Sequence, residues 1–151
     1  MTVVQTCALP IYLGLANVLK AMGDLEMRTS KLGEAEGHYR EAEELYRRIH
    51  LDIGLANVLR AMGNLWQKKE DYNKAINTYK AAADLYKKSA ELMGLTYTAS
   101  ELAFCYAKKT DVSNVMRCAS IVIELCDRLP YENVKQYCMY KISLAVKEIG
   151  G

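Results

Sequence analysis

Histidine side chains are the first candidates for metal binding or acid–base catalysis in this chain. The sequence has two, His38 and His50, which are twelve residues apart. On one helix that spacing separates the two side chains by roughly 18 Å, too far to share a metal ion. We interpret both as surface residues.

Cysteine is the other residue type with metal or redox chemistry, and five are present. Their spacing includes no Cys-x-x-Cys pair and no histidine at the distance of a zinc ligand. An odd number without close pairs favours a reducing, cytoplasmic location over a disulfide framework. We interpret four of them as small core residues, and a redox role for the middle two is the alternative: Cys105, Cys118, Cys126 and Cys138.

Familiar catalytic motifs are absent from the sequence. It has no Gly-x-x-x-x-Gly-Lys phosphate loop, no dinucleotide-binding glycine motif and no Gly-x-Ser-x-Gly elbow. Glu41, Glu43 and Glu44 stand at helical spacing from arginines, which is typical of a solvated, paired surface. We therefore expect no enzymatic activity, no metal and no cofactor.

Length and charge narrow the class of partner. The chain has 151 residues, enough for one domain, and a formal net charge of +2. So small a charge does not favour nucleic acid or an anionic membrane surface. No apolar run approaches the roughly eighteen residues of a membrane span. We expect a cytoplasmic protein with no nucleic-acid or membrane partner.

A glycine-leucine pair recurs along the chain with a step of 40 residues, at Gly14-Leu15, Gly54-Leu55 and Gly94-Leu95. Around the first two copies the match extends over residues 14–23 and 54–63, which differ only at Lys20 and Arg60. A fixed period of this size indicates a repeat architecture, in which each unit buries its apolar face on its neighbours.

Each repeat is predicted to contain two antiparallel helices. Apolar residues at steps of three and four predict a first helix from Leu13 to Arg28, along Leu15, Val18, Leu19, Met22 and Leu25. The same periodicity predicts a second helix from Glu34 to His50, with Ser30 as its N-cap, along Ala35, Tyr39, Ala42, Leu45 and Tyr46.

The next two repeats follow the same plan. Asp71 is the predicted cap of the helix that carries Tyr79, and Asp111 caps a helix from Val112 to Arg128. A helix from Met93 to Lys109 precedes it. Pro130 suits the first turn of a terminal helix over 131–149. The predicted repeats are about 14–53, 54–93 and 94–130, within one domain over 12–151.

The spacing of Gly23, Ala35, Tyr39 and Ala42, repeated 40 residues on, resembles that of the tetratricopeptide repeat in its longer, forty-residue variety. The family's proline near the end of the second helix is absent, with Arg47 in its place. The resemblance implies an all-α fold: an α-solenoid of antiparallel helix pairs, with about three repeats plus a C-terminal helix.

The N-terminal residues show a different resemblance. The stretch from Val4 to Ile11 is similar to the translation of a sequencing-library adapter. We therefore predict that residues 1–11 are a non-native leader, and a native N-terminal segment is the alternative.

The family resemblance also implies where a ligand binds, because first helices of successive repeats line the inner groove of such solenoids. Asparagine amides suit a peptide backbone, basic side chains suit carboxylates, and aromatic rings suit an apolar anchor. A solvated polar face is the alternative interpretation. The groove candidates are Asn17, Lys20, Asp24, Arg28, Asn57, Arg60, Asn64, Lys68, Tyr97, Phe104 and Lys108.

These observations predict a non-catalytic protein–protein interaction module, or scaffold, that binds a peptide or helix in a concave groove. The resemblance does not imply a clamp for C-terminal carboxylates, which needs a set of Lys, Asn and Arg, because only Lys20 fits it and an aspartate is repulsive there. The other positions hold Asp24, Ala61, Tyr97 and Glu101. The alternative function is a sensor domain of a larger NTPase or DNA-binding regulator truncated upstream. Self-association through an open apolar flank, Leu15 to Leu25, is a further expectation.

Overall fold

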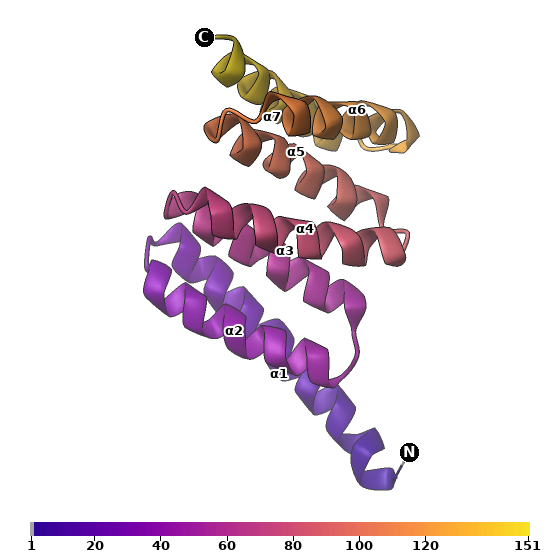
Figure 1. The fold of residues 1–151 in the computed structure, drawn as a ribbon. Coiled ribbons are helices and arrows are strands. Elements are labelled where there is room, and N and C mark those ends of the chain that lie inside the picture. Colours follow the sequence, from indigo (N-terminus) through magenta and orange to yellow (C-terminus); the bar gives the residue numbers. More distant parts are fainter. Residues whose placement is uncertain (1) are drawn as a thin grey trace.

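The computed structural model describes residues 2–151, and that part of the chain folds into seven helices. Each helix packs on the one before it, so that the chain rises in a stack from α1 at one end to α7 at the other (Figure 1). The expected all-α solenoid is confirmed. The helices are α1 (Val3–Arg28), α2 (Leu32–Arg48), α3 (Asp52–Lys68), α4 (Tyr72–Lys88), α5 (Leu92–Lys108), α6 (Val112–Arg128) and α7 (Glu132–Gly150).

The turns between helices repeat every 20 residues. In each of the first five turns a non-glycine residue has a φ between 54° and 61°: Ser30, His50, Glu70, Ala90 and Thr110. The flanking amides bond back to the preceding helix, as His50 N does to Arg47 O and Leu51 N to Tyr46 O. This is the Schellman pattern, which ends a helix and reverses the chain within three residues.

Helix capping agrees with two of three predictions. Asp71 and Asp111 accept hydrogen bonds from the amides of Lys74 and Asn114, as expected of N-caps. Ser30 is not a cap, because its left-handed conformation belongs to the end of α1, and the N-cap of α2 is Lys31. Pro130 likewise precedes the N-cap of α7, Tyr131, instead of opening the first turn.

Buried tyrosines hold the helix pairs together. Each ring lies so close to a glycine that a Cβ at the glycine would overlap it. All four rings are at most 2% exposed, which explains why glycine and tyrosine recur in register. The pairs are Tyr39–Gly23, Tyr79–Gly63, Tyr46–Gly54 and Tyr86–Gly94.

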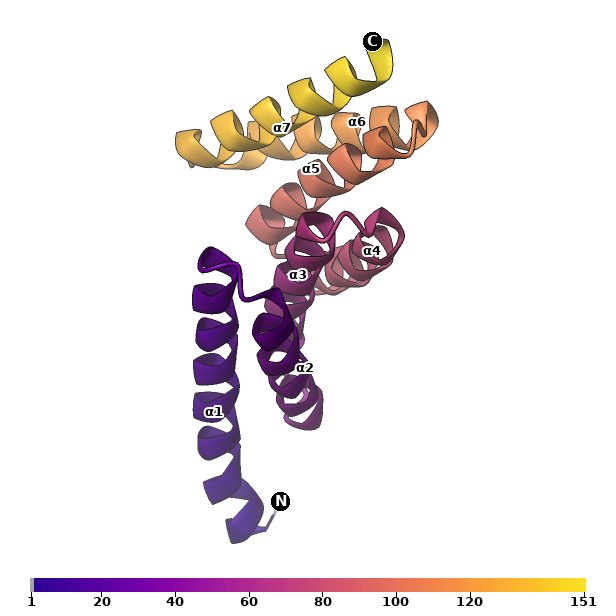
Figure 2. The ribbon, with the colours of Figure 1, turned by 90° about the vertical axis from the view of Figure 1, so that its left-hand side faces the viewer.

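The predicted leader is part of a helix. α1 begins at Val3 and passes through Pro10, beyond the expected start at Leu13. Figure 2 shows α1 as the outermost helix at its end of the stack. The stretch Thr6–Arg28 has a mean hydropathy of 1.2 and is long and apolar enough to cross a membrane, although the core helix of a soluble protein or an N-terminal signal sequence passes the same test. The expectation of no such run was wrong because it considered only uninterrupted apolar residues.

Candidate functional site

The polar groove candidates on α1 and α3 accept hydrogen bonds from the buried tyrosines. The Tyr39 hydroxyl donates to Asp24 at 2.8 Å, and the equivalent Tyr79 donates to Asn64 at 2.6 Å. A second set links Tyr46 to Asn17 and Tyr86 to Asn57, each at 2.6 Å. These four residues therefore position helices through their side-chain oxygens, which the sequence did not predict.

Basic candidates on the same two helices are less constrained. Lys20 pairs with Asp24 at 2.7 Å, and Lys68 donates to the carbonyl of Met27 at 2.8 Å, where the ends of α1 and α3 meet. Arg28 is exposed at that end.

Arg60 is the one described residue with a buried, unpartnered side-chain nitrogen, its Nε. Its guanidinium lies 5.6 Å from the centre of the Tyr97 ring. A buried donor without an acceptor is costly, so this nitrogen is an unsatisfied polar group between α3 and its neighbours.

The three candidates on α5 contact α7, contrary to the expectation of an open groove. Tyr97 packs on Tyr137 with ring centres 5.3 Å apart, and the Lys141 ammonium lies 4.4 Å from the centre of the Phe104 ring. Lys108 forms an ion pair with Glu148 at 2.7 Å. α7 packs mainly on α5 and less on α6, the helix directly before it, whereas α3 and α5 each pack extensively on the even-numbered helices on both sides of them in the chain.

A buried carboxylate fixes this position of α7. Glu101, 6% exposed, accepts hydrogen bonds from Tyr137 at 2.6 Å and from Gln67 at 2.9 Å, and it pairs with Lys141 at 2.9 Å. Burial raises the pKa of Tyr137, so its hydroxyl stays protonated and donating. The sequence offered a signal for this cluster, since Tyr137 and Lys141 lie four residues apart on one face of the terminal helix.

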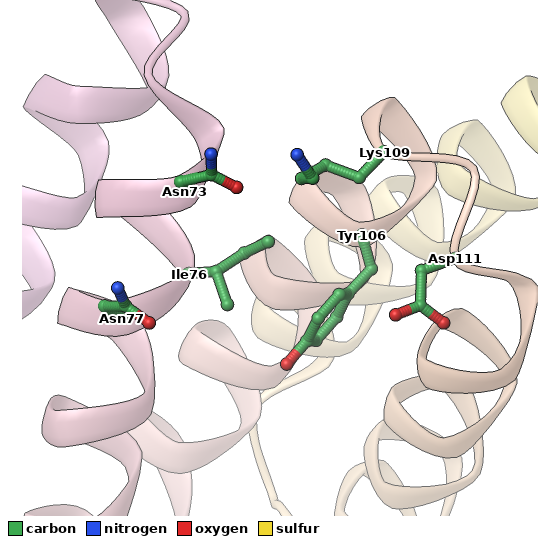
Figure 3. A pocket seen from close by; sticks show the side chains of 6 residues that line it. All are labelled: Asn73, Ile76, Asn77, Tyr106, Lys109 and Asp111. Atoms are coloured by element: carbon green, nitrogen blue, oxygen red, sulfur yellow. The ribbon is translucent and has the colours of Figure 1, made fainter.

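Several cavities lie on the other side of the helix pairs, between successive even-numbered helices. One of about 370 Å³ lies between α4 and the start of α6. Figure 3 shows side chains of α4 on one side of it and Lys109 and Asp111, from the turn between α5 and α6, on the other, with Tyr106 of α5 between them. The sequence analysis did not single out its lining, which is Asn73, Ile76, Asn77, Tyr106, Lys109 and Asp111.

At the equivalent position one repeat earlier, between α2 and the start of α4, an ion pair bridges the two sides. There Glu36 and Lys69 form an ion pair at 2.7 Å, and the hydrogen bond from Lys69 lowers the pKa of Glu36. The residue that replaces Glu36 after 40 positions is Ile76, which cannot pair with Lys109. The cavity between α4 and α6 is therefore a product of divergence between repeats.

The histidines and cysteines occupy structural positions. His38 Nδ1 lies 2.7 Å from Glu26 Oε2, which raises the pKa of His38. Cys105, Cys118 and Cys138 are free, and burial raises the pKa of each thiol to about 11, so they are protonated and unreactive at neutral pH. Within residues 2–151 no three metal-binding side chains come together.

Comparison with known proteins agrees with this geometry. The sequence profile of the tetratricopeptide repeat matches residues 12–88. Among solved structures, the crystal structure of BtubC (BKLC) from P. vanneervenii is similar, with a TM-score of 0.71 and 20% identity over 78% of this chain and 49% of that one. The chain thus spans about half the length of that protein, and a likeness at this identity concerns the fold alone. No match was found among curated proteins.

Proposed function

Because the chain belongs to the tetratricopeptide repeat family, whose repeats are generally protein-interaction modules, we propose that it binds an acidic segment of a partner protein along α1 and α3. The proposal assigns it no catalytic step. The observation that carries it is the excess of cations among the groove candidates of these two helices. The groove candidates of α1 and α3 include only one carboxylate, Asp24, which is already paired with Lys20. The cations among them are Lys20, Arg28, Arg60 and Lys68.

A further feature supports an extended ligand at this place. Asn57 and Asn64 use their oxygens for tyrosine hydroxyls, so their amide NH2 groups remain to donate to a peptide backbone. Since α7 packs on α5, the proposed groove ends at Tyr97.

A charge reversal with a matched control tests the proposal. Arg28→Glu with Lys68→Glu alters two exposed cations of the proposed groove, and Lys80→Glu with Lys87→Glu makes the same charge change on exposed residues of α4. A phage-displayed library of random peptides would be selected on the purified chain, and the recovered peptides synthesised and titrated by calorimetry.

We expect the recovered peptides to be rich in Asp and Glu, to bind more weakly at high salt, and to lose at least about tenfold in affinity on the groove variant alone. Neutral or basic peptides, or equal losses on both variants, would contradict the proposal. Circular dichroism of both variants checks that helicity is unchanged. Asn57→Ala is a less suitable test, because that change would also remove the acceptor of the Tyr86 hydroxyl.

A further inference from the structure

The outer face of α1 has the same residues as a buried face of α3, yet no other helix of residues 2–151 covers it. Val18 is 55% exposed and Leu25 62%, whereas their equivalents Val58 and Leu65 are fully buried. Leu15 and Met22 are also exposed, at 47% and 42%, against 7% and 6% for the equivalent residues of α3. Because the sequences match, the difference comes from position: α2 packs on α3, and no helix of the described chain takes that place on α1.

A glycine on the same face leaves space for a side chain from a partner helix. Gly54 and Gly94, near the starts of α3 and α5, are in close contact with the rings of Tyr46 and Tyr86 from the preceding helix. Gly14 holds the equivalent position on α1, and no side chain lies within 4 Å of where its Cβ would be. A glycine costs helix stability, roughly 1 kcal/mol relative to alanine, so its use at Gly54 and Gly94 is explained by the tyrosine that it admits.

We propose that α1 is the docking site for a helix of another helical-repeat protein, one with the chemistry of α2 and α4. Such a helix presents a tyrosine preceded by small residues, as Tyr46 is preceded by Ala42 and Ala35. Its tyrosine ring packs over Gly14, and its apolar side covers Leu15 and Val18. The same chain contains this arrangement twice, at the junctions of α2 with α3 and of α4 with α5.

A second copy of this chain is a poorer occupant. Tyr46 and Tyr86 are already buried within their own chain, and α6 has Cys126 at the equivalent position. Tyr140 on α7 is exposed, but Gln136 stands where α2 has Ala42, so that helix cannot approach as closely. A lipid bilayer would match the apolar composition of α1, but binding to a bilayer does not require the space that Gly14 leaves.

Fluorescence anisotropy with a labelled peptide of residues 29–51, which contains α2, tests the docking on the full chain. Gly14→Ala fills the gap without disturbing the chain itself, since its Cβ meets no other atom. Gly37→Ala, on the exposed side of α2, is the matched control with an equally free Cβ. A second peptide carries Tyr46→Ala.

We expect the peptide to bind saturably to the parent chain and equally well to the Gly37→Ala variant, in which Gly14 is intact. Gly14→Ala in the chain, and Tyr46→Ala in the peptide, should each weaken binding at least about tenfold. Absence of binding, or equal binding to the two variants, would overturn the proposal. Equal binding would mean that the peptide replaces α2 in its own site.

Two parallel measurements address the other occupants. Light scattering of the chain alone, at increasing concentration, detects self-association, and sedimentation with anionic phospholipid vesicles detects membrane binding. A concentration-dependent mass that Gly14→Ala abolishes would assign the face to a second copy. Co-sedimentation unaffected by Gly14→Ala would assign it to lipid. Either result would overturn a partner helix as the occupant. The charge reversals on Arg28 and Lys68 test the groove of the preceding subsection and are independent of these measurements.

Discussion

At the scale of single residues, the His38–Glu26 contact makes stability depend on pH. The hydrogen bond to Glu26 raises the pKa of His38 above its ordinary value of 6.5 in the folded state. The protonated form therefore stabilises the fold: the contribution is complete below pH 6.5 and is lost as pH rises through the raised pKa.

We expect the urea midpoint of unfolding to fall over that pH range more in the parent chain than in His38→Gln. The two curves should converge at higher pH, where both side chains are neutral. Parallel curves throughout would show that the pair contributes nothing, as is common for exposed ion pairs.

The buried Glu101 is the second residue-scale case. Glu101→Gln leaves Lys141 partly buried without its counter-charge, which we expect to lower the free energy of unfolding by about 3 kcal/mol. Adding Lys141→Met should recover most of that loss, because a neutral pair has no uncompensated charge. Chemical denaturation of the parent, both single variants and the double variant measures the coupling. A double variant as unstable as the two losses combined would show that the pair is not coupled.

At the scale of elements, the turns carry strain that glycine would relieve. Ala90 has a φ of 54°, a left-handed conformation that costs a non-glycine residue roughly 1–2 kcal/mol. Ala90→Gly should therefore raise the free energy of unfolding by about 0.5–1 kcal/mol, since part of the gain is offset by the freedom of glycine in the unfolded chain. Thermal unfolding measures the change, and the same substitution at the exposed helical position Ala81 should destabilise.

Elements were also where sequence and structure agreed most closely. Four helices with predicted bounds, α2, α5, α6 and α7, lie within two residues of them, because the helical spacing of apolar residues is a local signal. The position of α7 was not predictable in this way. It depends on the long-range bonds of Glu101 with Gln67, Tyr137 and Lys141, which the 40-residue repeat pattern does not predict. The tyrosine bonds of Asn57 and Asn64 were missed for the same reason.

At the scale of the whole molecule, each repeat of a solenoid is stabilised by contacts with its neighbouring repeats. An end repeat has fewer such contacts and should unfold locally before an inner one. Residues 14–23 and 54–63 provide an internal comparison, since they differ only at Lys20 and Arg60. Their intrinsic amide exchange rates are therefore nearly equal, and any difference in protection reports position in the stack.

Hydrogen exchange followed by mass spectrometry of peptides from the two segments measures that difference. We expect the α1 segment to exchange at least about tenfold faster than the α3 segment, because one face of α1 is open to water while the matching face of α3 lies under α2. Equal rates would mean that the chain unfolds as one cooperative unit despite its repeats. If a helix docks on α1 as proposed, adding the peptide of residues 29–51 should slow exchange in residues 14–23 and leave residues 54–63 unchanged, which separates docking from general stabilisation.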